Sequence, residues 1–93
     1  MNKRPNADAT ATFLRCEELR QRAGLSIDEL VQLSGNRPAR SSVQRLERGL
    51  AIRAHNTFRV ATALKKKLTE IGAELFDVDK EVVRHGSTAK PTE

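Results

Sequence analysis

The sequence contains no tryptophan and no tyrosine, and it has only three phenylalanines in 93 residues. Proteins that bind single-stranded nucleic acid stack the bases on exposed aromatic rings, so this scarcity argues against such a platform. Cysteine is almost absent too, because Cys16 stands alone. No disulfide can form within the chain, and we expect a reducing compartment, the cytoplasm.

Long apolar runs are also missing. No such run follows Lys3 and Arg4, so no signal peptide is predicted, and no stretch has the length of a transmembrane helix. The spacings typical of nucleophilic, acid–base or phosphate-loop chemistry do not stand out. His55 has no histidine, cysteine or acidic residue at ligand spacing. We therefore expect no enzyme, no metal, no cofactor and no membrane partner.

Positive charge is concentrated in one part of the chain. The net charge is +5, and the stretch from Arg37 to Lys67 carries nine lysines and arginines against a single acid, Glu47. This stretch therefore has a net charge of +8, and the rest of the chain must carry −3. Such an asymmetry indicates an anionic partner that binds at the basic stretch.

A short amphipathic helix is predicted within the basic stretch, over residues 41–48. Its apolar side carries Val43, Leu46 and Leu50. Its polar side carries Ser41, Gln44, Arg45 and Arg48. Ser41 and Gln44 have the spacing of a capping box, and Gly49 has the position of a left-handed C-cap. Glutamine can pair with adenine and arginine with guanine, so this side suits base edges in the DNA major groove. A solvated helix face is the alternative.

Two further helices are predicted before this one. The first begins with Thr12 as its N-cap, and its buried stripe is Phe13, Cys16, Leu19 and Ala23. Cys16 in that stripe is expected to be a buried hydrophobe and not a redox-active thiol. The second helix begins with a capping box at Ser26 and Glu29 and closes at Gly35. Its inner side carries Ile27, Leu30, Val31 and Ser34.

The first helix ends in Ala23-Gly24-Leu25-Ser26, and the third ends in Leu46-Glu47-Arg48-Gly49. This order of segments resembles the XRE-type helix-turn-helix family of Cro and phage repressors over about residues 13–64, and the third ending is its most specific part. The resemblance implies that the third helix is the recognition helix. The turn over residues 35–40 is longer than is usual in the family, so a start near Pro38 is the alternative. The base contacts predicted on this ground are Arg40, Ser41, Ser42, Gln44 and Arg45.

The resemblance also gives a role to the lone acid, Glu47. Arg20 matches the family position that pairs with this glutamate, so a salt bridge should pin the recognition helix to the first helix; an exposed counter-charge is the alternative. The predicted phosphate contacts are Arg37, Arg48, Arg53 and Asn56. The last two lie at the start of the following helix, where backbone N–H groups also attract anions.

A long helix is predicted over residues 54–71, before Gly72, from the spacing of Ala54, Thr57, Phe58, Ala61, Leu64, Leu68 and Ile71. The lysines at 65–67 are expected on a solvated face; a DNA contact is the alternative. Residues 73–77 and 80–84 are short runs with β propensity and predict a hairpin; a helix over 69–76 is the alternative. Because a small domain gains from a second subunit, the apolar residues there are predicted to form a dimer interface: Leu75, Phe76, Val82 and Val83.

The predicted fold is mainly α, a helix-turn-helix repressor-like bundle of four to five helices with a short C-terminal β-hairpin. The predicted divisions are a flexible arm (1–10), the DNA-binding domain (11–72), the dimerisation hairpin (73–86) and a disordered tail (87–93). An arm that enters the minor groove with Lys3 and Arg4 is the alternative for the first.

The predicted function is sequence-specific binding of double-stranded DNA by a transcriptional regulator of a bacterium or mobile element. A homodimeric repressor that recognises an inverted repeat is expected. The alternative is a helix-turn-helix module, such as an antitoxin or anti-regulator, that binds a protein partner.

Overall fold

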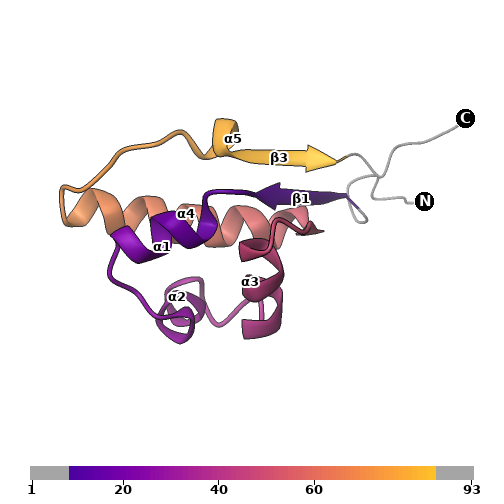
Figure 1. Cartoon of the computed structure of the whole chain (residues 1–93), viewed down its shortest axis with the longest axis horizontal. Helices are drawn as coiled ribbons and strands as arrows, with labels where there is room; N and C mark the ends of the chain where they lie inside the picture. The colour runs from indigo at the N-terminus through magenta and orange to yellow at the C-terminus, as the bar shows by residue number, and fades with distance from the viewer. Residues whose placement is uncertain (1–8, 86–93) are drawn as a thin grey trace, which may run out of the picture.

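The computed structural model describes residues 9–85, which form five helices and three strands (Figure 1). In chain order these are β1 (Thr10–Phe13), α1 (Cys16–Arg22), α2 (Ile27–Leu33), α3 (Arg40–Glu47), β2 (Ile52–Arg53), α4 (Ala54–Glu70), α5 (Val78–Glu81) and β3 (Val82–His85). The described part is thus mainly helical, as expected for the fold class, and it contains a small three-stranded antiparallel sheet that was not expected. Within it, no helix has both the length and the apolar character needed to cross a bilayer.

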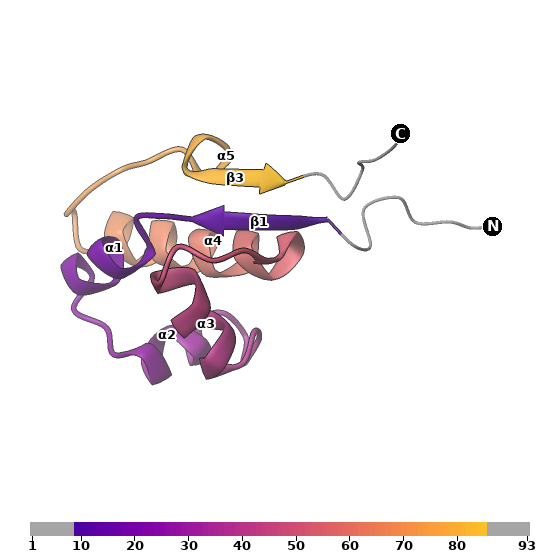
Figure 2. The ribbon, with the colours of Figure 1, turned by 45° about the vertical axis from the view of Figure 1, so that its right-hand side comes forward.

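The sheet has the order β2-β1-β3, so β1 is its central strand. Ala11 of β1 lies opposite Ile52 of β2 and Arg84 of β3. Ala11 and Phe13 are fully buried, whereas Thr10 and Thr12 are half-buried, which is the alternation of a strand with one face on the core. Strands β1 and β3 lie on one side of α4, and α2 and α3 lie on the other (Figure 2).

The predicted start of the first helix is wrong. Thr12 does not cap a helix, because it belongs to β1, and α1 begins only at Cys16 without a side-chain cap. The predicted apolar stripe is nevertheless buried throughout, since Phe13, Leu19 and Ala23 all lie in the core. Phe13 enters the core from strand β1. The backbone N–H and C=O groups of this strand bond to β2 and β3, whereas in a helix they would bond to residues nearby in the sequence.

Helix α4 is the longest element and its predicted stripe is largely confirmed. Its buried residues are Ala54, Thr57, Val60, Ala61, Ala63, Leu64 and Leu68. Two residues of the stripe depart from the prediction: Phe58 is only half-buried, and Ile71, which follows the last turn, is 49% exposed. The buried Thr57 hydroxyl donates to the Ala11 carbonyl at 3.0 Å, which ties α4 to the middle of β1. Helix α2 has the predicted capping box, with both Ser26–Glu29 hydrogen bonds present.

The predicted C-terminal hairpin is wrong, and so is the alternative helix over 69–76. Helix α4 ends at Glu70, and Gly72 follows with a φ of 66°, a left-handed conformation that favours glycine. The chain then runs back without regular structure to α5, and β3 pairs with β1. The free edge of β1 accepts β3 because Val82 then enters the core at 4% exposure. Phe76 is buried too and stacks on Phe13, with ring centroids 6.1 Å apart.

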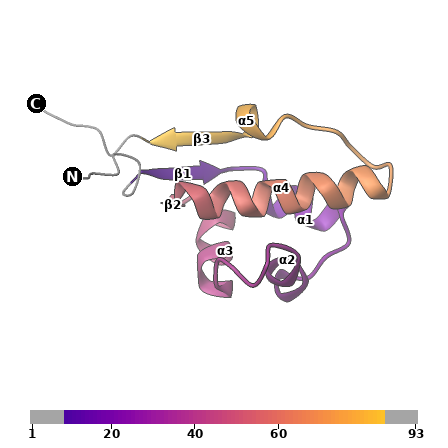
Figure 3. The same cartoon turned by 180° about the vertical axis from the view of Figure 1, so that it is seen from behind.

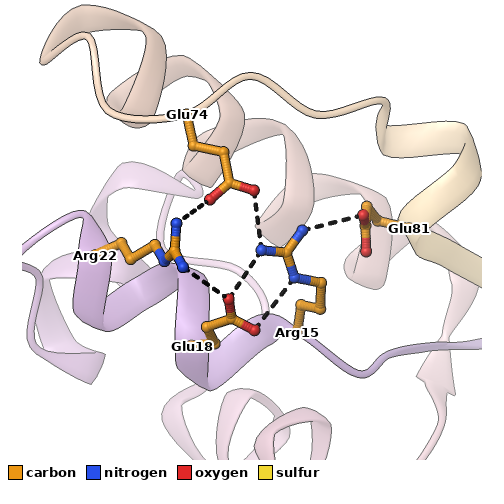
Figure 4. Close-up of polar contacts among 5 residues, drawn as sticks. All are labelled: Arg15, Glu18, Arg22, Glu74 and Glu81. Atoms are coloured by element: carbon orange, nitrogen blue, oxygen red, sulfur yellow. Dashed lines mark hydrogen bonds and ion pairs between the residues drawn. The ribbon is translucent and has the colours of Figure 1, made fainter.

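The segment after α4 is also held by charge (Figure 4). Arg15, just before α1, forms ion pairs with Glu18 and Glu74 at 2.9 Å each and with Glu81 at 3.3 Å. Arg22 completes the network at 2.7 Å from Glu74. The hydrogen bonds from Arg15 to the glutamates, the one to Glu18 most of all, raise the pKa of Arg15. The hydrogen bond from Arg15 also lowers the pKa of the Glu18 carboxyl. Residues 73–85 are therefore part of the same folded unit as α1 and β1. The predicted tail (87–93) and most of the predicted arm (1–10) lie outside the described residues.

We expect Phe76→Ala to lower the free energy of unfolding by about 3–5 kcal/mol, the usual cost of removing a buried ring. Leu75→Ala is the matched control, because Leu75 is 74% exposed whereas Phe76 is 9% exposed. It should change the free energy of unfolding by no more than about 0.5 kcal/mol. Urea denaturation of both variants measures the difference. Equal losses would contradict the assignment of Phe76 to the core.

Candidate nucleic-acid interface

Helix α3 begins at Arg40, between the two predicted starts. Its N-cap is Ala39, and no side chain bonds to the cap, so the predicted capping box of Ser41 and Gln44 is wrong. Ser41 lies inside the first turn instead, where its side chain is exposed. The C-terminal end is as predicted: Gly49 has a φ of 84° after the last turn. The early start brings the Arg40 side chain onto the helix itself.

The two sides of α3 differ sharply in burial. Val43 and Leu46 are fully buried and anchor the helix, as predicted, but Leu50 is 44% exposed, contrary to its expected place on the apolar side. It follows the left-handed Gly49, where the helical periodicity has already ended. The predicted base-contact residues lie on the outer side: Arg40, Ser41 and Arg45 are exposed, and Ser42 and Gln44 are half-buried.

The predicted salt bridge between Arg20 and Glu47 is present. The Arg20 guanidinium donates from Nε and Nη2 to the two carboxylate oxygens of Glu47, at 2.5 and 3.3 Å. Nη1 of the same guanidinium donates to the Leu25 carbonyl at 2.9 Å. The two side chains are only 15% and 10% exposed. This hydrogen bonding to Glu47 raises the pKa of Arg20. The pair joins the end of α3 to α1 and to the loop before α2.

Cys16 lies in the core near this pair. It is fully buried, and burial first, then the charge of Glu47, raises the pKa of its thiol to about 12. A thiol with so high a pKa carries almost no thiolate near pH 7, and thiolate is the reactive form. The expectation that Cys16 is a structural hydrophobe is confirmed by this burial.

The predicted phosphate contacts lie on both sides of α3 in the sequence. Arg37 precedes the helix and Arg48 follows it, and both are exposed. Arg53 is the N-cap of α4 and is exposed, and Asn56 is half-buried in the first turn of that helix. Within residues 9–85, no carboxylate forms an ion pair with Arg37, Arg45, Arg48 or Arg53.

One contact of the interface was not predicted. Arg40 donates to Asp28 of α2 at 2.8 Å, and these side chains are 57% and 65% exposed. Opposite charges at these positions were visible in the sequence, but their approach depends on how α2 and α3 pack. The pair is thus far more accessible than that of Arg20 and Glu47.

The four predicted dimerisation residues divide into two pairs. Phe76 and Val82 are buried in the core of their own chain, so the prediction that they face a second subunit is wrong. The stacking on Phe13 and the β1–β3 pairing account for their apolar character. Leu75 and Val83 are 74% and 48% exposed, and Val83 lies on β3, an edge strand.

No family model, curated protein or solved structure was found to match this chain. Among residues 9–85, histidine, cysteine and acidic side chains do not gather into a group of three or more that could hold a metal ion.

We expect Glu47→Gln to lower stability by about 1.5–3 kcal/mol, because it leaves a largely buried guanidinium without its charged partner. Asp28→Asn is the control, since it breaks the exposed pair with Arg40 and should change stability by less than about 0.5 kcal/mol. Thermal unfolding followed by circular dichroism compares the two variants. If Glu47→Gln melts with the wild type, the Arg20 pair does not hold α3 in place.

Proposed function

We propose that this protein is a sequence-specific double-stranded DNA-binding regulator of the helix-turn-helix type, with α3 as its recognition helix. The observation that carries this proposal is the division of α3. Val43 and Leu46 anchor it in the core, while Ser41 and Arg45 project from a helix whose end is clamped by Glu47. A rigid helix with an accessible polar side is what major-groove recognition requires.

The chemistry of the outer side suits base edges. Gln44 can pair bidentately with adenine, and Arg45 with guanine. Arg45 has no competing ion pair within the described residues, so no internal bond must break before it binds. Arg40 would exchange Asp28 for DNA, at little cost because exposed pairs contribute only about 0–1 kcal/mol.

Phosphate contacts would come from residues around α3. Arg37, Arg48 and Arg53 are exposed cations, and Asn56 lies in the first turn of α4. Each cation that neutralises a phosphate releases condensed counterions, so affinity should fall steeply with salt concentration. The net charge of +8 between Arg37 and Lys67 supports this electrostatic term.

We further propose that two copies pair through the edge of β3. That edge has backbone groups without a strand partner in the described structure, and Val83 is half exposed beside it. Neighbouring strands lie about 4.8 Å apart, so a sheet joined at β3 would place the two β2 strands roughly 24 Å apart. Helix α3 lies beyond β2 as seen from β3 (Figure 3), so the recognition helices would be farther apart. Such a separation approaches one turn of DNA, about 34–36 Å, and suits an inverted repeat.

Repression in a bacterium or mobile element, in the cytoplasm, remains part of this proposal. It rests on the resemblance to Cro and phage repressors, which lies in residues 23–26 between α1 and α2, in α2 itself and in Leu46-Glu47-Arg48-Gly49.

Substitutions on α3 test the proposed recognition. Gln44→Ala and Arg45→Ala should each cost about 1–3 kcal/mol of binding to a selected DNA site and relax the base preference. Arg53→Ala should weaken all sequences alike and reduce the salt dependence by about one counterion. Selection of sites from random duplex DNA, followed by fluorescence anisotropy at several salt concentrations, measures both effects. Lys80→Ala, an exposed cation on α5, is the control and should bind as the wild type does. An unchanged base preference in both α3 variants would refute the assignment.

The β3 interface makes a separate prediction. Val83→Lys should place like charges near each other across the proposed two-fold axis and convert the dimer to a monomer. Its affinity for a full inverted repeat should fall about tenfold or more, while affinity for an isolated half-site stays unchanged. Val83→Thr keeps a β-branched side chain and serves as the control. Light scattering reports the mass in solution. A Val83→Lys dimer would place the interface elsewhere, and a monomeric wild type would remove the dimer from the proposal.

A further inference from the structure

A groove of about 540 Å³ lies along α4. Figure 3 shows the molecule with this helix in front. Helix α4 supplies most of its lining, the end of α2 supplies Leu33, and β3 supplies Arg84. None of the predicted base or phosphate contacts lines it. The groove is therefore a surface that the proposed DNA interface does not use.

The lining combines apolar side chains with cations. Leu33 is 51% exposed, and Phe58 is half-buried. The Arg84 guanidinium lies 4.7 Å from the centre of the Phe58 ring, and Arg59 and Lys66 are both exposed. Arg59 and Lys66 are seven residues apart, so they lie on one side of α4 with a rise of roughly 10 Å between them. No carboxylate among residues 9–85 forms an ion pair with any of the three cations.

The combination of apolar side chains and cations favours one kind of ligand for the groove over others. A second copy related by a two-fold axis would bring the same surface onto itself, so Arg59, Lys66 and Arg84 would meet cations. Duplex DNA would use the cations but gain nothing from Leu33, since phosphates need no apolar contact. A helix with apolar residues on one side and carboxylates along its flanks would use both features.

We propose that this groove, which we call the α4 groove, binds an acidic amphipathic helix of a partner protein. Apolar side chains of the partner would cover Leu33 and Phe58, and its carboxylates would pair with Arg59, Lys66 and Arg84. The outer side of α3 does not line the groove, so the proposed base contacts and the proposed partner site use different side chains. The inference goes beyond DNA binding and does not depend on it.

A designed peptide tests the proposal with the full-length chain. The probe is a synthetic helix with leucine at every third or fourth position and glutamate between, and the control peptide has serine in place of leucine. The leucine peptide should bind saturably and shift the backbone amide signals of Leu33, Phe58 and Arg84 in NMR spectra. The serine peptide should bind about tenfold more weakly or worse.

Two neighbouring lysines give matched variants. Lys66 lines the groove and Lys65 does not, although both are exposed on α4. Lys66→Glu should weaken the leucine peptide about tenfold, whereas Lys65→Glu should change its affinity by less than about twofold. Leu33→Ser should weaken the leucine peptide and leave the serine peptide unaffected. Gln44→Ala and Arg45→Ala should leave both peptides unaffected, which separates this test from that of DNA binding.

Three outcomes would overturn the proposal. The first is that the leucine peptide fails to bind, or shifts the signals of α3 in place of those of the groove. The second is that both peptides bind equally, because the surface then attracts any polyanion. The third is that duplex DNA shifts the groove signals and both lysine variants weaken DNA equally, which would make this face part of the DNA footprint.

Discussion

The central strand β1 is the constraint on which the other elements depend. A strand inside a sheet needs partners on both edges, and β1 takes β2 on one side and β3 on the other. These partners come from the middle and the end of the chain, so four residues join segments about 40 and 70 positions away. The Thr57 hydroxyl adds α4 by bonding to the Ala11 carbonyl. Helix α4, which follows α3 and β2 in the chain, is thereby fixed to the sheet.

Local signals in the sequence were sufficient for α2 and α4, and insufficient for α5 and for the sheet. The capping box of Ser26 and Glu29 and the apolar spacing of α4 depend on neighbours three or four residues away, and both are present. Thr12 was assigned to a helix because Phe13, Cys16 and Leu19 also fit helical spacing. A single buried side chain such as Phe13 fits both the helical period and the strand period. Only pairing with a distant strand decides whether the segment is a helix or a strand. The predicted hairpin is wrong for the same reason, because β3 pairs with the distant strand β1 and not with residues 73–77.

The candidate interface was predictable to the extent that it lies on one helix. The outer side of α3 follows from its periodicity, and the Arg20–Glu47 pair follows from the resemblance and from the isolation of Glu47 among cations. The α4 groove was not predictable, because Leu33, Phe58 and Arg84 are brought together only by the packing of α2, α4 and β3. From the sequence alone, Leu33 looks like a residue at a helix end, Phe58 like a core residue and Arg84 like a solvated cation.

Two arginine–carboxylate pairs show how one chemistry can serve the fold and the site differently. Arg20 and Glu47 are largely shielded from water, and Arg20 also donates to the Leu25 carbonyl. Removing either partner would leave the other charge unpaired where the fold has already desolvated it. Arg40 and Asp28 are mostly exposed, so water or an anion can replace the partner at little cost. The first pair can hold α3 rigid while the second can be exchanged. A helix anchored at its C-terminal end and chemically free at its N-terminal end can therefore change its partners without disturbing the core.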